Sequence, residues 1–216
     1  MNHVVMSAEF YKLMLVTHRQ DVPIPQYLNF IKQCISSGVT SVQLREKNTN
    51  ESLKLEFALE LKHLLGTYQI PLIINDDIHL ALQVNAEGVH LGQSDACPLY
   101  ARNQLGTQKF IGLSIESESD LTQANTSELT YVAASAVFPS QNKNNLKKIW
   151  GIEGLSRLCN QSSHPVIGIG GIDQDNLNKV LQSGAQGVAV IGALHQAKNP
   201  AAMALTLRKI IDHRSF

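Results

Sequence analysis

The sequence predicts an α/β fold, a single (β/α)8 or TIM barrel, because eight short apolar segments alternate with segments of helical pattern. Consecutive apolar segments start about 16 to 35 residues apart, which leaves room for a crossover helix after each strand. Several are rich in valine, isoleucine and leucine on both faces, which is typical of strands buried in a parallel sheet. No linker or low-complexity segment divides the chain, so we expect one domain over residues 1–216.

The expected strands follow one another along the whole chain. They cover residues 12–16, 41–44, 72–75, 88–91, 110–114, 131–135, 166–170 and 187–191. Between them, apolar residues recur three and four positions apart, for example Tyr27, Ile31 and Cys34, as on one face of a helix. Gly38 and Gly184 stand where helix C-caps are expected, shortly before strands. An open, doubly wound parallel sheet is the alternative architecture.

Composition and charge indicate a globular protein with small-molecule ligands. Hydrophobic residues make up 44% of the 216 positions and charged residues 17%, which is enough apolar material for a large core. Lys and Arg (18) balance Asp and Glu (18), and no basic block is present. This balance argues against nucleic acid or an anionic membrane as the main partner. Whether the chain forms a homo-oligomer is left open.

The cysteines and the N-terminal residues indicate the cellular compartment in which the protein is expected. Cys34, Cys97 and Cys159 lie far apart and form no CxxC pair, so a reducing compartment is expected rather than a disulfide framework or zinc site. The first 12 residues lack a basic segment followed by an apolar one, and no apolar run reaches 18 residues. We therefore expect a cytoplasmic protein.

Polar residues follow the expected strands at the end where a barrel keeps its chemistry. Gln43, Arg45 and Lys47 come first, and period-2 alternation places all three on one face. A fixed pair of cations at the mouth of a sheet suits a phosphate or diphosphate group. Solvated surface charge is the alternative interpretation of this segment.

Two carboxylates, Asp76 and Asp95, follow neighbouring expected strands and suit Mg²⁺. Lys143 follows another strand and can join Arg45 and Lys47 around the same centre. Three cations and Mg²⁺, less two carboxylates, give a charge of +3, which balances the roughly three negative charges of a diphosphate. The alternatives are a helix N-cap within Asn75-Asp76-Asp77, a cap by Asp95 for a helix entered through Pro98, and a solvated loop for Lys143.

Glycines follow the last two expected strands, at Gly170-Gly171 and Gly192. Their backbone N–H groups can face a ligand, and barrels commonly bind phosphate at this place. A tight turn at the glycine pair is the alternative. His79 and His90 have no partner at metal-site spacing, and we interpret both as structural or surface residues.

The ordered motifs resemble the thiamine-phosphate synthase (thiamine-phosphate pyrophosphorylase) family over about residues 12–194. The phrases that carry the resemblance are residues 42–47, 74–77, 88–95, 112–114, 137–143 and 169–172, each at a strand end. The resemblance implies a Mg²⁺-dependent barrel enzyme. It would condense 4-amino-2-methyl-5-(diphosphooxymethyl)pyrimidine with a thiazole phosphate, giving thiamine phosphate and pyrophosphate.

The same resemblance implies a role for each matching residue. Asp76 and Asp95 would hold Mg²⁺, and Arg45, Lys47, Lys143 and Ser114 would be the catalytic residues around the diphosphate. The pyrimidine diphosphate would contact Gln43, Arg45, Lys47, Asn75, Ser114 and Lys143. The thiazole phosphate would contact Ser140, Asn142, Gly171, Ile191 and Gly192. Diphosphate loss before attack by the thiazole nitrogen needs stabilised charge rather than a strong base.

The chain departs from the family pattern on the thiazole side. Where the family usually has Thr-x-Thr-Lys, residues 140–143 of this chain are Ser-Gln-Asn-Lys. Ser135-Ala136 replaces a Gly-Pro pair of the family, and Gly192 replaces a serine. A related thiazole tautomerase branch tends to lose the metal carboxylates and has a histidine shortly after the serine that Ser114 matches. A non-catalytic barrel that binds a phosphate ligand is the alternative from another class. The retained Asp76 and Asp95 favour the synthase.

Overall fold

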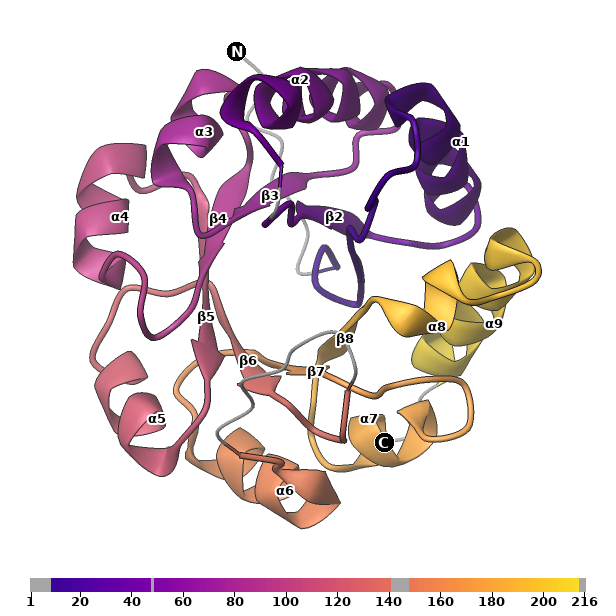
Figure 1. Cartoon of the computed structure of the whole chain (residues 1–216). Coiled ribbons are helices and arrows are strands. Elements are labelled where there is room, and N and C mark those ends of the chain that lie inside the picture. The colour runs from indigo at the N-terminus through magenta and orange to yellow at the C-terminus, as the bar shows by residue number, and fades with distance from the viewer. Residues whose placement is uncertain (1–8, 48, 141–147, 214–216) are drawn as a thin grey trace.

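The computed structural model describes residues 9–47, 49–140 and 148–213. Within that part of the chain, eight parallel strands form a closed barrel in the order β1 to β8. The last strand pairs with the first in the register Leu13 with Val188 and Leu15 with Val190. Figure 1 shows the strands at the centre and the helices in a ring around them. The predicted (β/α)8 barrel is confirmed, and the open doubly wound alternative is wrong because β1 and β8 are paired.

The helices and strands alternate as the apolar pattern predicts. The strands are β1 Leu13–Val16, β2 Ser41–Leu44, β3 Leu72–Asn75, β4 Gly88–Leu91, β5 Phe110–Ile115, β6 Tyr131–Ser135, β7 Val166–Ile169 and β8 Gly187–Val190. The helices are α1 Ile24–Ile35, α2 Glu51–Thr67, α3 Ile78–Gln83, α4 Pro98–Leu105, α5 Glu118–Ala124, α6 Gly151–Gln161, α7 Leu177–Gln182, α8 Gly192–His195 and α9 Pro200–Asp212. Each strand boundary falls within one residue of its expected position.

Glycines follow helix ends where the backbone must turn into a strand. The residues at the C-cap positions of α1 and α7 are Ser36 and Ser183, so the expectation that Gly38 and Gly184 are the caps is wrong by one or two positions. Gly38 has φ of 120° and Gly184 has φ of 104°, a region that residues with a Cβ rarely adopt. A Cβ on Gly38 would also lie 2.7 Å from the Cβ of Arg208 in α9. Both glycines are therefore required by backbone geometry and close packing.

The core has two layers, as expected of a barrel whose strands are buried on both faces. The larger layer lies between the strands and the helices and includes Ile31, Leu61 and Leu155. The smaller one fills the inside of the barrel. It consists of Phe10, Tyr11, Met14, Val16, Ile73, Tyr131, Ala133, Ile167 and Ala189. The barrel is a packed core, so ligands can enter only above this layer.

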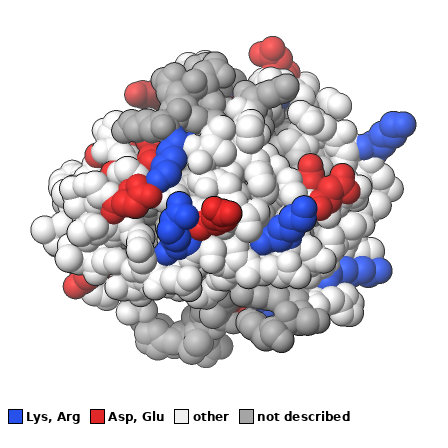
Figure 2. Space-filling model, turned by 90° about the horizontal axis from the view of Figure 1, so that it is seen from below, with Lys and Arg blue, Asp and Glu red and all other residues white. Residues whose placement is uncertain are grey.

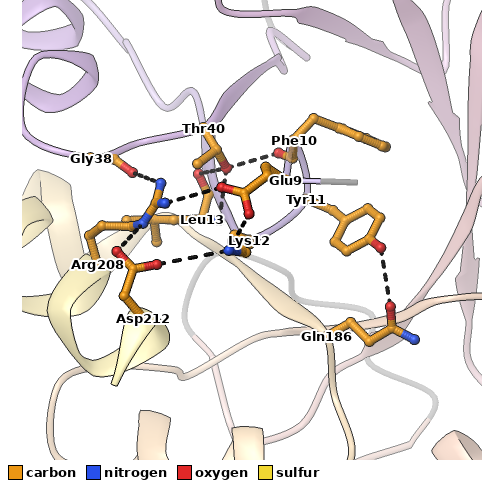
Figure 3. Close-up of polar contacts among 10 residues, drawn as sticks. All are labelled: Glu9, Phe10, Tyr11, Lys12, Leu13, Gly38, Thr40, Gln186, Arg208 and Asp212. Carbon is orange, nitrogen blue, oxygen red and sulfur yellow. Dashed lines mark hydrogen bonds and ion pairs between the residues drawn. The ribbon is translucent and has the colours of Figure 1, made fainter. Parts of the chain in front are cut away.

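The segment before β1 covers the N-terminal end of the barrel. Phe10 stacks on Phe110, the first residue of β5, with ring centroids 4.1 Å apart. Figure 3 shows the polar contacts that hold this segment. The Thr40 hydroxyl donates to the Phe10 carbonyl at 2.9 Å, and Arg208 lies 3.3 Å from Glu9. This end of the barrel is closed, which leaves the carboxyl ends of the strands for chemistry.

The outer surface carries charges of both signs. On the face that Figure 2 shows, Lys and Arg side chains lie beside Asp and Glu side chains rather than gathering by sign. Over the described surface as a whole, opposite charges form ion pairs, as in the 2.8 Å contact between Arg208 and Asp212. This mixed surface agrees with the equal numbers of acidic and basic residues and gives that face no strong field of one sign. Among the described residues, no helix has the length and apolar character needed to cross a bilayer.

Candidate active site

A cavity of about 880 Å³ opens at the carboxyl ends of the strands. Its wall takes residues from the ends of all eight strands, beginning with Val16 of β1 and ending with Val190 of β8. Ala189 and Ile169 form part of its floor above the packed interior. This is the end of a barrel at which active sites are found, because eight separate loops meet there.

The first wall comes from β2 and the residues after it. Gln43, Arg45 and Lys47 all line the cavity, as the alternation predicts. The segment is held beyond the strand by Thr17, whose hydroxyl accepts from the Arg45 backbone N–H at 2.8 Å and donates to the Arg45 carbonyl at 3.3 Å. The Gln43 amide is buried and donates to the sulfur of Met14 at 3.4 Å.

The residue between the two cations faces the other way. Glu46 lies 3.5 Å from Arg19, and both side chains are nearly inaccessible. Arg19 also lies over the ring of Phe57 in α2. Glu46 is thus anchored between the barrel and the helices, so Arg45 and Lys47 are directed into the cavity. Burial lowers the pKa of the Arg45 guanidinium, an effect that the nearby Asp76 opposes.

The adjacent wall, after β3 and β4, carries the two carboxylates. Asp76 follows β3 with a φ of 65°, and its backbone N–H donates to the His90 carbonyl at 2.8 Å. Asp95 lies in the loop after β4, where its Oδ2 accepts from the Gly92 N–H at 2.7 Å. Burial, followed by the neighbouring Asp95, raises the pKa of the Asp76 carboxyl to about 6. A buried carboxyl whose pKa is raised in this way, beside a second carboxylate, forms a site prepared for a cation.

Lys47 joins this acidic pair to the cationic wall. Its ammonium lies 3.7 Å from Asp76 Oδ2. Asp77, the next residue, has a different task, because its Oδ1 accepts from the Leu80 N–H at 2.9 Å and caps α3. The helix-cap alternative is therefore correct for Asp77 and wrong for Asp76. The alternative that Asp95 caps α4 is also wrong, since the N-cap residue of α4 is Cys97.

Ser114 stands on the cavity wall at the end of β5. Its hydroxyl lies 2.9 Å from His90 Nε2, and its carbonyl accepts from the Gln93 amide at 2.5 Å. His90 is buried and has a second contact, Nδ1 to the Tyr131 hydroxyl at 2.9 Å, as expected of a structural residue, but it also lines the cavity. His79 belongs to α3 and does not line the cavity.

The last wall is made by glycine backbone. Gly170 and Gly171 have φ of 98° and 63°, and a Cβ on Gly171 would lie 2.5 Å from the Pro139 carbonyl oxygen. The Gly171 carbonyl accepts from the Asn176 amide at 2.8 Å, which orients this turn. The turn is tight, as the alternative states, and it also lines the cavity.

The remaining residues singled out in the sequence fall into two groups. Asn75, Ser140, Ile191 and Gly192 line the same cavity as the carboxylates and cations. Asn142 and Lys143 lie outside the described residues. Among the described residues, no group of three or more His, Cys, Asp or Glu side chains is arranged to hold a metal ion. A metal here would have two protein carboxylates and take its other ligands from water and substrate.

Several cavity residues escaped the sequence reasoning. Glu116 lies two positions after Ser114, so alternation along β5 would have placed it on the same wall. Asp173 follows the glycine pair and could have been found by extending the search past the turn. Gln196 and Met203 come from the region of α8 and α9. No sequence pattern marks them, since their position depends on how these helices pack over the barrel.

Comparison with known proteins places this barrel in one family. A family model described as thiamine monophosphate synthase matches residues 13–194. The thiamine-phosphate synthase of Chlamydia abortus is 42% identical over 207 residues, covering 96% of this chain and 98% of that protein. The Vibrio parahaemolyticus protein of the same name is 40% identical over 203 residues, covering 94% and 98%.

Solved structures agree with this placement. Thiamine phosphate pyrophosphorylase from Pyrococcus furiosus superimposes with a TM-score of 0.85 at 30% identity, over 94% of this chain and 96% of that one. A 3-hexulose-6-phosphate synthase, at a TM-score of 0.69 and 16% identity over 93% and 99% of the two chains, shares the fold alone. From its matched length, its relatives and its closed barrel, the chain belongs to the thiamine monophosphate synthase family.

Proposed function

We propose that the chain is a thiamine-phosphate synthase, a transferase that uses Mg²⁺ and releases pyrophosphate. Its substrates would be 4-amino-2-methyl-5-(diphosphooxymethyl)pyrimidine and a thiazole phosphate. Family membership and relatives at about 40% identity support the reaction. The observation that carries the proposal is that two carboxylates and two cations face one cavity at the end of the barrel.

Mg²⁺ suits the acidic wall. Asp76 and Asp95 offer hard oxygen ligands, and burial together with the nearby Asp95 makes the charge of Asp76 costly until a cation is present. A site with one or two protein carboxylates, completed by water and substrate phosphate, is the arrangement that Mg²⁺ commonly has in proteins. Bound Mg²⁺ would neutralise charge on the diphosphate oxygens. Asp76 and Asp95 would hold the ion.

The diphosphate would lie between the acidic pair and the cationic wall. Arg45 can donate two parallel hydrogen bonds to phosphate oxygens, and Lys47 adds a point charge. Arg45 is partly buried, so its attraction for an anion is screened less than at an open surface. Gln43, Asn75 and Ser114 line the same cavity and would bind the rest of the pyrimidine substrate.

The reaction breaks one C–O bond and forms one C–N bond. The pyrimidine methylene carbon loses diphosphate together with the bonding electron pair. The lone pair of the thiazole nitrogen then forms the new bond to that carbon. No proton is transferred in either step, so the site needs fixed charge at the leaving group and close placement of the substrates. Arg45, Lys47 and Ser114 would supply these interactions, together with Lys143, which lies outside the described residues.

The glycine wall would bind the thiazole phosphate. Gly171, Ile191 and Gly192 line the cavity away from the acidic pair, and Ser140 lies beside them on its wall. Backbone N–H groups can bind phosphate without side-chain contacts. Substitutions on this wall are therefore compatible with phosphate binding, although they would alter affinity. Asn142 is proposed for the same subsite from the sequence.

The two alternatives fit the cavity less well. The tautomerase branch tends to lack the metal carboxylates, whereas Asp76 and Asp95 both line this cavity. The position after Ser114 and Ile115 is Glu116, so the histidine expected of that branch is not there. A non-catalytic phosphate-binding barrel would have little use for an acidic pair beside two cations. The synthase reaction uses both walls.

A cytoplasmic location is part of the proposal. Among the described residues, Cys34, Cys97 and Cys159 form no disulfide bond, which suits a reducing compartment. Small-molecule substrates fit the enclosed cavity, and the mixed surface charge suits neither nucleic acid nor an anionic membrane. The proposal does not specify the oligomeric state.

The proposal is tested with both phosphorylated substrates. The protein is incubated with them in Mg²⁺ or in EDTA, and thiamine phosphate and pyrophosphate are measured separately. We expect the two products in equal amounts with Mg²⁺ and neither in EDTA. Asp77→Asn, which alters a helix cap beside the site, should retain the Mg²⁺-dependent activity. Absence of thiamine phosphate from the Mg²⁺ reaction of the wild-type protein would refute the proposal.

A further inference from the structure

A buried hydrogen-bonded chain connects the interior of the barrel to the cavity. The Tyr131 hydroxyl lies 2.9 Å from His90 Nδ1, and His90 Nε2 lies 2.9 Å from the Ser114 hydroxyl. Tyr131 is completely inaccessible, and His90 is 6% exposed. Ser114, the last member, lines the cavity. The proposed reaction uses Ser114 but gives no role to His90 or Tyr131.

The backbone makes room for this chain. His90 of β4, Gly112 of β5 and Tyr131 of β6 stand opposite one another in register across three neighbouring strands, whose order is visible in Figure 1. A Cβ on Gly112 would lie 2.2 Å from Cζ of Tyr131 and 2.6 Å from His90 Nδ1. The two side chains therefore meet in space that exists because residue 112 has no side chain. A contact built in this way is specified by the fold.

The direction of the hydrogen bonds follows from Tyr131. A buried hydroxyl must donate its hydrogen, because an unpaired donor away from water loses the hydrogen bond it would make to water. Among the described residues, the Tyr131 hydroxyl has one hydrogen-bond partner, His90 Nδ1. Nδ1 must then be the acceptor, so the ring proton of the neutral imidazole is on Nε2. The Nε2–H group donates to the Ser114 oxygen.

This direction determines what Ser114 can offer a ligand. Its oxygen already accepts from His90, and its own hydrogen has no acceptor among the described residues. The hydroxyl hydrogen therefore faces the cavity as a donor. An oxygen of the leaving diphosphate is an acceptor that gains negative charge during the reaction, so a donor held toward it stabilises the transition state.

We propose that His90 and Tyr131 are positioning residues that select one histidine tautomer and thereby keep the Ser114 hydroxyl as a hydrogen-bond donor to the leaving diphosphate. The inference rests on the proposed function for the identity of the ligand. Without Tyr131, the histidine could place its proton on either nitrogen. In the other tautomer Ser114 would donate to Nε2 and would have no hydrogen left for the substrate.

The tautomer is measured without reference to activity. Long-range ¹H–¹⁵N correlation spectra of the histidine rings distinguish Nδ1–H from Nε2–H, and His90→Gln identifies the His90 signals by their loss. We expect Nε2–H in the wild-type protein and a mixture of tautomers in Tyr131→Phe. Tyr11→Phe is the matched control, because Tyr11 belongs to the same interior cluster but donates to Gln186 at 3.1 Å. It should leave the His90 spectrum unchanged.

The catalytic consequence is measured with a double-mutant cycle. Tyr131→Phe should lower kcat about 10-fold with little change in the KM for the pyrimidine diphosphate, since the donor acts mainly in the transition state. Ser114→Ala should lower kcat about 100-fold. Adding Tyr131→Phe to Ser114→Ala should change kcat by less than about 2-fold, because Tyr131 acts through the missing hydroxyl.

A conservative variant separates positioning from packing. Gln at position 90 can place an amide N–H near the former Nε2, whereas Leu cannot, so His90→Gln should be clearly more active than His90→Leu. Nδ1–H in the wild-type protein, or additive effects of Tyr131→Phe and Ser114→Ala, would overturn the inference even if the enzyme is active. A wild-type protein without synthase activity but with the Nε2–H tautomer would refute the reaction while supporting the hydrogen-bond direction.

Discussion

Replacing Asp76 by Asn should stabilise the metal-free protein while abolishing its Mg²⁺-dependent activity. The carboxyl of Asp76 has its pKa raised from 3.8 to about 6, first by burial and then by Asp95. The native state therefore binds more protons than the unfolded state between these values. Stability must fall as the pH rises from about 4 to 6, and the loss persists above pH 6.

The size of the effect follows from the pKa. If the carboxyl were fully buried, this rise in its pKa would lower the free energy of unfolding by roughly 3 kcal/mol above pH 6. The Asp76 side chain is 31% exposed, and solvent screens its interactions, so about 1 to 1.5 kcal/mol is expected. Asn also tolerates the φ of 65° at this position better than most residues do. Asp shares this tolerance, so the backbone adds no difference between the variant and the wild type, and the expected stabilisation comes from the pKa alone.

Thermal unfolding in EDTA at several pH values measures the prediction. At pH 8 the Tm of Asp76→Asn should exceed that of the wild type by about 2–6 °C, and the difference should vanish near pH 4. Mg²⁺ at 100 times its dissociation constant should stabilise the wild type by about 2.7 kcal/mol and leave the variant unchanged. The same variant should form no thiamine phosphate.

Asp77→Asn is the control, because it changes the neighbouring carboxylate. Burial tends to raise the pKa of Asp77, but the Leu80 N–H and Lys54 outweigh it and the net pKa is lowered. Its charge is therefore stabilising above about pH 4, and its loss should destabilise the protein slightly and leave the Mg²⁺ response intact. A lower stability of Asp76→Asn at pH 8 in EDTA, or a difference that does not depend on pH, would refute this reasoning.

Three further predictions follow from the same cavity. Asp95→Asn should reduce Mg²⁺-dependent turnover at least 10-fold with little loss of Tm, and unchanged turnover would remove Asp95 from the metal site. Thr17→Val removes the hydroxyl that bonds both backbone groups of Arg45. It should cost about 1–2 kcal/mol in a urea titration and raise the KM for the pyrimidine diphosphate more than that for the thiazole phosphate. Gly171→Ala forces a Cβ to within 2.5 Å of the Pro139 oxygen and should cost at least about 1 kcal/mol. Steady-state kinetics should then show a raised KM for the thiazole phosphate, and a selective rise for the pyrimidine diphosphate would reverse the subsites.

The strands and the cationic wall could be predicted because their signals are local. A strand turns successive side chains to opposite faces, so Gln43, Arg45 and Lys47 share a wall whatever the rest of the chain does. Valine- and isoleucine-rich segments spaced by helix-sized intervals likewise indicate a buried parallel sheet. These rules placed each strand to within one residue.

The acidic wall was harder to predict from the sequence, because two neighbouring aspartates have different roles. Asp76 and Asp77 are equivalent in the sequence, and either could cap a helix. The structure separates them, since Asp77 accepts from the Leu80 N–H while Asp76 takes a positive φ beside His90. Burial and an adjacent carboxylate set the pKa of Asp76, and both depend on residues from another strand.

The sequence by itself determined the barrel class, the polar strand ends and the family resemblance, because these depend on periodicity, spacing and short motifs along the chain. Tertiary structure decided that β8 pairs with β1, that Asp76 lies beside Lys47, and that His90 and Tyr131 meet over Gly112. Each of these contacts joins residues far apart in the chain. They form only when the sheet closes and removes the side chains from water. Burial and the new neighbours then shift the pKa of a carboxylate and select the tautomer of a histidine.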